Sequence, residues 1–223
     1  MLPGPDLVIA CPHCNALARH HTLRSGNTFG AILWSDGKLE APMLPQFPDV
    51  TKCHRCKHFY WVEEAEVKRR IDFFGDTSSE KLDVKIEDVL KELRGIEPVK
   101  PLSIEEYIEA IESGVSSNAK RERYLRIHLW WETNDMIRRD PEAEVPTKYN
   151  EKLQYNFANL LILLDEHVPD DKMMKAEILR ETGCFEETIQ LLDDIPEKYR
   201  QIADKIIEFA KNRDRVVRQV QRL

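Results

Sequence analysis

The 223-residue sequence has no long hydrophobic run: its uninterrupted apolar stretches are no longer than five residues, as at 160–164. A membrane-spanning helix needs about 20 apolar residues. The first ten residues also lack the basic start and the long apolar stretch of a secretory signal. We therefore expect no transmembrane segment and a cytoplasmic location.

Catalytic motifs are also absent. The sequence contains no glycine-rich phosphate loop, no His-Glu-x-x-His pair, and no spacing that suggests a Ser/His/Asp or Cys/His arrangement. With 42% hydrophobic and 33% charged residues, the composition is that of a folded protein. An enzyme with an acidic cleft in the helical part is therefore only the third hypothesis for function.

The chain has no overall excess of basic charge. Its net charge is −7; residues 1–62 hold six basic and four acidic side chains, and the remainder holds 27 and 36. An acidic body does not attract a phosphate backbone, which needs clustered Lys and Arg. Residues 198–223 are locally basic, and we interpret them as a solvated helix whose end complements its own dipole.

Four of the five cysteines form two C-x-x-C pairs, and this is the strong chemical signal of the sequence. The pairs Cys11/Cys14 and Cys53/Cys56, 38 residues apart, have the spacing of a tetrahedral zinc site. Four thiolates leave no open position, so we expect structural zinc. A residue with positive φ often follows such a knuckle; Asn15 suits that position better than Lys57.

Two alternatives to a four-cysteine zinc site remain. Cys-Pro-His-Cys after an apolar run is similar to a thioredoxin-like redox motif, but no βαβ pattern follows it. His58 or His20 could replace one cysteine as a ligand. Cys184 is interpreted as a small buried hydrophobic residue.

The sequence predicts an α+β protein: a small β-rich zinc ribbon followed by a mainly α-helical domain of antiparallel helical hairpins. We place the ribbon at 1–75, a linker with a short helix at 76–100, and the helical domain at 101–223. Short apolar runs near 7–10, 29–34, 39–41 and 59–62 predict strands, and Asp36-Gly37 predicts a hairpin turn. Helices are expected near 103–113, 118–139, 147–165, 169–182, 185–192 and 202–209, with a last short helix after residue 214.

Two features of the helical part draw attention. Residues 173–195 are similar to a single tetratricopeptide-type helical hairpin that turns at Gly183, without a second copy at the 34-residue period. On a helix, Trp131, Asn134, Asp135 and Arg138 share one face. This face is either a polar binding site or, as we favour, an Asp135–Arg138 or Asn134–Arg138 pair that anchors neighbouring helices.

Most of the chain resembles a group of uncharacterised bacterial proteins. The resemblance rests on the runs WSDG at 34–37, APMLP at 41–45 and AEILRETGCF at 176–185, on the two knuckles, and on Asn134, Asp135 and Arg138. It implies a bacterial cytosolic protein that joins a zinc ribbon to a tetratricopeptide-like helical part. It implies no activity and no catalytic residue.

The leading hypothesis for function is a non-enzymatic zinc-binding protein that acts as an interaction or scaffold module for a protein partner. The alternative is nucleic-acid binding by the ribbon through its basic side chains, which are Arg19, Arg24, Lys52, Arg55 and Lys57.

Overall fold

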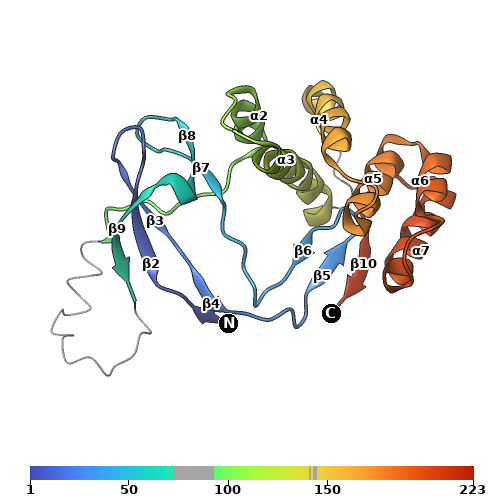
Figure 1. The fold of residues 1–223 in the computed structure, drawn as a ribbon, viewed down its shortest axis with the longest axis horizontal. Helices are drawn as coiled ribbons and strands as arrows, with labels where there is room; N and C mark the ends of the chain where they lie inside the picture. The colour runs from blue at the N-terminus through green and yellow to red at the C-terminus, as the bar shows by residue number, and fades with distance from the viewer. Residues whose placement is uncertain (73–92, 141, 143–144) are drawn as a thin grey trace. The chain divides into compact units, whose positions relative to one another are not determined.

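The computed structural model describes residues 1–72, 93–140, 142 and 145–223. The chain divides into two compact units. The ribbon unit consists of Met1–Thr28 and Met43–Glu106, and the helical unit consists of Phe29–Pro42 and Tyr107–Leu223. A β-rich N-terminal region of small sheets precedes the helices, so the predicted α+β class is confirmed (Figure 1).

This division differs from the domain boundaries expected from the sequence. We placed residues 29–42 in a continuous ribbon domain at 1–75, whereas the structure groups them with the helices. The pairing of residues 32–34 with residues 219–222 and the buried carboxylate of Asp36 tie this hairpin to the helical unit. Most of the predicted linker with a short helix, at 76–100, lies outside the described residues.

The described residues of the ribbon unit form three small antiparallel sheets. The central strand β2 pairs with β3 on one side and β9 on the other, β7 pairs with β8, and β1 pairs with β4. The strands are β1 (Leu2–Pro3), β2 (Asp6–Ala10), β3 (Leu17–His20), β4 (Leu23–Ser25), β7 (Val50–Lys52), β8 (Phe59–Trp61) and β9 (Glu66–Ile71).

Strand β2 is apolar throughout its centre because both of its faces are covered. Val8 packs with Ile71 and Leu93 on one face. Ile9 belongs to a second cluster, with Tyr60 and the buried cysteines. Successive side chains of a strand point to opposite faces, so a strand covered on both sides needs a continuous apolar run rather than an alternating one.

The helical unit contains a three-stranded sheet in the order β10-β5-β6. Strands β5 (Ile32–Trp34) and β6 (Leu39–Glu40) form the predicted hairpin, and Gly37 takes a φ of 80° in its turn. Strand β10 (Gln219–Arg222) pairs antiparallel with β5, as Figure 1 shows. The sheet therefore joins chain segments about 190 residues apart.

The helices predicted between residues 103 and 209 are present, and none in the described part of the chain is both long and apolar enough to cross a membrane. Ser103 and Glu106 form the predicted capping box, with backbone N–H to side-chain oxygen distances of 3.1 and 3.2 Å. The helices are α2 (Ile104–Glu112), α3 (Ala119–Arg139), α4 (Asn150–Leu163), α5 (Pro169–Thr182), α6 (Phe185–Leu192) and α7 (Glu197–Lys211).

Helices α5, α6 and α7 pack against one another in sequence, joined by short turns. Gly183 ends α5 with a φ of 92°, a left-handed conformation that favours glycine. Ala176, Leu192, Ala203 and Ile206 fill the core between these helices. Helical hairpins of the predicted kind are therefore present.

Gly183→Ala is expected to lower the free energy of unfolding of the helical unit by about 1–2 kcal/mol, the cost of a left-handed non-glycine residue. A Cβ atom at this position would also meet the Arg215 side chain at 1.8 Å. Urea unfolding measures the change. Gly30→Ala is the comparison, because Gly30 also has a positive φ but open space around it. Unchanged stability of both variants would contradict the prediction.

The prediction of a short helix after residue 214 is wrong, because this segment leads into strand β10. Arg213 takes a φ of 55° and ends the helical path. The fully buried Arg180 donates to the carbonyl oxygens of Asp214 and Val216, and Ser35 exchanges two hydrogen bonds with Arg218. These contacts hold the segment extended beside β5. They form only when distant parts of the chain come together, so the local sequence does not predict them.

Candidate functional site

The two knuckles of the ribbon unit have the same backbone geometry. In each, the first cysteine accepts a hydrogen bond at its carbonyl oxygen from the residue four positions later, at 2.9 Å from Asn15 and 3.0 Å from Lys57. Asn15 has a φ of 57° and Lys57 a φ of 64°, so both occupy the left-handed region. Lys57 thus takes the conformation for which it is less suited than Asn15.

These turns bring the four cysteine sulfurs together. All four Sγ atoms lie within 4.8 Å of one another, and the distances between the knuckles are 3.8 Å for Cys11–Cys56 and 3.6 Å for Cys14–Cys53. A tetrahedral metal with sulfur ligands at about 2.3 Å separates its sulfurs by about 3.8 Å. The donor set and its spacing therefore fit a tetrahedral metal ion.

The surroundings of two of the thiols shift their pKa values in opposite directions. Burial raises the pKa of Cys11 to about 12. The pKa of Cys53 falls to about 7, because hydrogen bonds from the backbone N–H groups of Cys56 and Arg55 outweigh its burial. Four thiolates this close repel one another, so a divalent cation is needed to hold all of them ionised.

The structure weighs against both alternatives for the cysteines. Among the described residues, the cluster of candidate metal ligands contains cysteines alone. His58 is exposed; its ring stacks on His13 at 4.8 Å, and its Nδ1 lies 3.2 Å from the carbonyl oxygen of Cys56. The first knuckle leads into strand β3 rather than a helix, so it lacks the helix N-terminus that makes a thioredoxin-like thiol acidic.

Three of the five basic side chains considered for nucleic-acid binding already lie near carboxylates. Arg24 pairs with Asp72, Arg19 lies 4.0 Å from Asp6, and Lys52 lies 3.8 Å from Glu106. The Lys57 ammonium donates to the carbonyl oxygen of His54. These contacts reduce the positive charge that the ribbon unit presents to a phosphate backbone.

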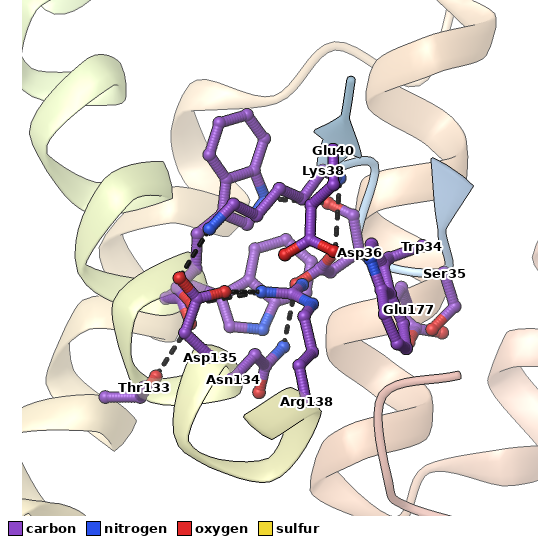
Figure 2. Close-up of polar contacts among 12 residues, drawn as sticks. Trp34, Ser35, Asp36, Lys38, Glu40, Thr133, Asn134, Asp135, Arg138 and Glu177 are labelled. Atoms are coloured by element: carbon purple, nitrogen blue, oxygen red, sulfur yellow. Dashed lines mark hydrogen bonds and ion pairs between the residues drawn. The ribbon is translucent and has the colours of Figure 1, made fainter. Parts of the chain in front are cut away.

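The second predicted site is a buried polar cluster in the helical unit (Figure 2). Trp131, Asn134, Asp135 and Arg138 lie on α3 and contact the β5–β6 hairpin. The predicted Asp135–Arg138 ion pair is present, and both side chains are nearly inaccessible. The structure thus places all four residues against the β5–β6 hairpin, whereas the structural interpretation expected the pair to anchor neighbouring helices.

The centre of this cluster is Asp36, whose side chain is fully buried. Its carboxylate accepts hydrogen bonds from Arg138, from the Asn134 amide at 2.9 Å and from the Lys38 backbone at 3.1 Å. Its carbonyl oxygen accepts one from the Trp131 indole at 3.1 Å. A buried carboxylate is stable only with such partners, so Asp36 anchors the hairpin to α3.

Further charged groups extend the cluster. Lys38 donates to Asp135 at 2.6 Å, and Glu181 accepts hydrogen bonds from Trp130 at 2.8 Å and Asn134 at 3.0 Å. Burial and the nearby carboxylates of Glu177 and Asp36 raise the pKa of Glu181 well above its usual value. In the rest of the cluster, the Asp36 and Asp135 carboxylates face the cations of Arg138 and Lys38.

Asp36, Lys38 and Glu181 are partners of α3 in this cluster that sequence reasoning missed. The Asp36-Gly37 pair was interpreted only as hairpin chemistry. Asp36 and Arg138 are 102 positions apart, and no local pattern connects residues at such a separation.

The imidazole of His128 lies on the same helix as this cluster, enclosed by aromatic rings. Its ring centre is 4.0 Å from that of Tyr124, 5.0 Å from that of Trp131 and 5.9 Å from that of Tyr107. Burial, followed by the positive charge of Lys38, lowers its pKa to about 4. His128 is therefore neutral in the folded protein at pH 7.

We expect His128 to destabilise the helical unit in acid. The unfolded chain binds a proton below about pH 6.5, whereas the folded chain does so only near pH 4, so stability falls with pH between these values. The loss at pH 5 is about 2 kcal/mol. Urea unfolding at pH 7 and pH 5 checks this, with His128→Phe as the control that keeps an aromatic ring. An equal pH dependence of both proteins would refute it.

The two sites thus differ in kind. The thiol cluster offers four sulfur ligands around one point, whereas the polar cluster on α3 satisfies its own charges internally.

Comparison with family models, with curated proteins and with solved structures gives no match for this chain.

Proposed function

We propose that this protein is a non-catalytic interaction module in which the four cysteines hold one structural zinc ion. The proposal rests on the closed set of four cysteine sulfurs, which lie at the spacing of a tetrahedral metal site. Zinc suits four thiolates in tetrahedral geometry and needs no redox chemistry. The site leaves no position for substrate, and reduced thiols of this kind suit a cytoplasmic protein.

The helical unit supplies the surface that we assign to a protein partner. A groove of about 560 Å³ lies along α4, α5 and α6, with Leu161, Leu179 and Leu191 among its lining residues. The assigned surface also includes the outer face of α4, where Tyr155 is 61% exposed and Ile162 is 81% exposed, although neither lines the groove. Helical hairpins that present such a groove resemble tetratricopeptide units, which support binding of an extended or helical segment with apolar anchors.

Site-specific photocrosslinking tests this assignment. A photoreactive residue at position 162 or 155 is expected to crosslink a protein partner in cells, whereas one at the exposed position 208 on α7 is not. Ile162→Asp should abolish capture from position 155. Equal capture from all three positions, or none from any, would contradict the assignment.

Nucleic-acid binding by the ribbon unit is the alternative, and the pairing of Arg19, Arg24 and Lys52 with carboxylates disfavours it. A gel shift with DNA and RNA at low salt separates the two functions. We expect no salt-dependent shift, and a strong one would favour the alternative.

A further inference from the structure

A second cavity lies on the other side of α5, between the β5–β6 hairpin and α7. Its volume is about 220 Å³. The hairpin contributes Leu33 and Trp34, α5 contributes Met173 and Met174, and α7 contributes Tyr199, Ile202 and Ile206. This cavity borders the polar cluster at Trp34, whose ring centre lies 5.2 Å from the Arg138 guanidinium, and it is separate from the groove along α4, α5 and α6.

The walls of this cavity favour an apolar ring. Cavities of about 150 Å³ lined by Leu, Ile and Phe stay dry and take up benzene, so about 220 Å³ has room for a bicyclic ring system. Trp34 and Tyr199 offer aromatic faces, and the two methionines adapt their shape to different rings. The Leu33, Trp34, Met173 and Tyr199 side chains are partly exposed, so the cavity opens to solvent.

One charged residue lines the cavity, and its charge indicates which charge a ligand would carry. Asp170, in the first turn of α5, is a lining residue and is exposed. Within the described part of the chain, Asp170 forms no ion pair. The helix N-terminus stabilises Asp170 as a carboxylate. The Lys198 ammonium lies 4.5 Å from the centre of the Tyr199 ring, so one face of this ring is taken by a cation of the chain itself.

We propose that this cavity binds a small molecule composed of an apolar aromatic ring and a cationic amino group. The ring occupies the space between Trp34, the methionines and Ile202, and the ammonium group faces the Asp170 carboxylate. The acidic balance of the chain, with 40 acidic against 33 basic residues, favours a cation over an anion.

Isothermal titration calorimetry of the full chain with three indoles tests the proposal. We expect tryptamine, a cation, to bind about two- to fivefold more tightly than neutral indole, the range of one exposed ion pair. Indole-3-acetate, an anion, should bind more weakly than indole. Amide chemical shifts should change around residues 33–37, 170–174 and 199–206.

Three variants complete the test. Asp170→Asn should remove the preference for tryptamine while retaining indole binding, and Glu151→Gln, at an exposed carboxylate on α4, should change neither. Ile202→Trp should weaken all three ligands by filling the cavity, with circular dichroism confirming its fold. Absence of binding at millimolar ligand, shifts confined to other residues, or a tryptamine preference that survives Asp170→Asn would overturn the proposal.

Discussion

Cys53→Ser is expected to reduce the zinc content of the purified protein from one ion per chain to nearly none, and to unfold the ribbon unit. A structural zinc site contributes about 10–16 kcal/mol of apparent binding energy, which in small metal domains is folding energy. Cys53 and Cys11 are buried within the core that also contains Ile9 and Tyr60, so loss of the metal removes the link between the two knuckles at the centre of this core. Elemental analysis and loss of amide dispersion for residues 1–28 and 43–72 measure the two effects.

Cys184→Ser is the matched control for this experiment. Cys184 is a partly buried cysteine of the helical unit, at the start of α6. Its replacement should leave the zinc content at one per chain and the ribbon unit folded. A wild-type protein that contains no zinc yet keeps a folded ribbon would disprove the metal assignment.

Arg138→Leu is expected to lower the free energy of unfolding of the helical unit by about 3–5 kcal/mol. Removal of one partner from a buried ion pair leaves an uncompensated charge in a medium of low polarity. The Arg138 side chain is 3% exposed and pairs with both Asp36 and Asp135; Lys38 still reaches Asp135, but Asp36 loses its only charged partner among the described residues. Urea unfolding, followed by tryptophan fluorescence, measures the loss.

The neighbouring arginine provides the control for this change. Arg139 lies 3.5 Å from the same Asp135 but is 75% exposed, so Arg139→Ala should cost at most about 0.5 kcal/mol. The double variant Asp36→Asn/Arg138→Leu should regain part of the lost stability, because it removes the stranded carboxylate. Equal effects of the two arginine replacements would show that the buried pair is not stabilised as described.

Local chemistry made the knuckles and most helices predictable from the sequence. A C-x-x-C pair forms its turn within a few residues, and the helices α3 to α6 follow from caps, glycine stops and apolar spacing. The structure adds only the distance between the two knuckles, at which the four sulfurs fit a tetrahedral metal ion. Lys57 shows the limit of propensity, because the hydrogen bonds of the knuckle impose a conformation that its side chain disfavours.

The missed features all depend on contacts between distant parts of the chain. Strand β10 exists because β5, Ser35 and Arg180 offer partners to residues that would otherwise continue as helix or loop. The assignment of residues 29–42 to the helical unit depends on Asp36 meeting Arg138. Neither hydrophobic periodicity nor turn residues indicate which distant segment a hairpin will contact.

The pairing of β5 with β10 also constrains the time course of folding on the ribosome. Ile32 is synthesised about 190 residues before its partner Arg222. At about 5–20 residues per second, the hairpin therefore waits about 10–40 s for the strand that completes its sheet. Contacts of such separation slow folding. During this interval the nascent hairpin exposes an unpaired strand edge, which is a site where nascent chains associate unless it is protected.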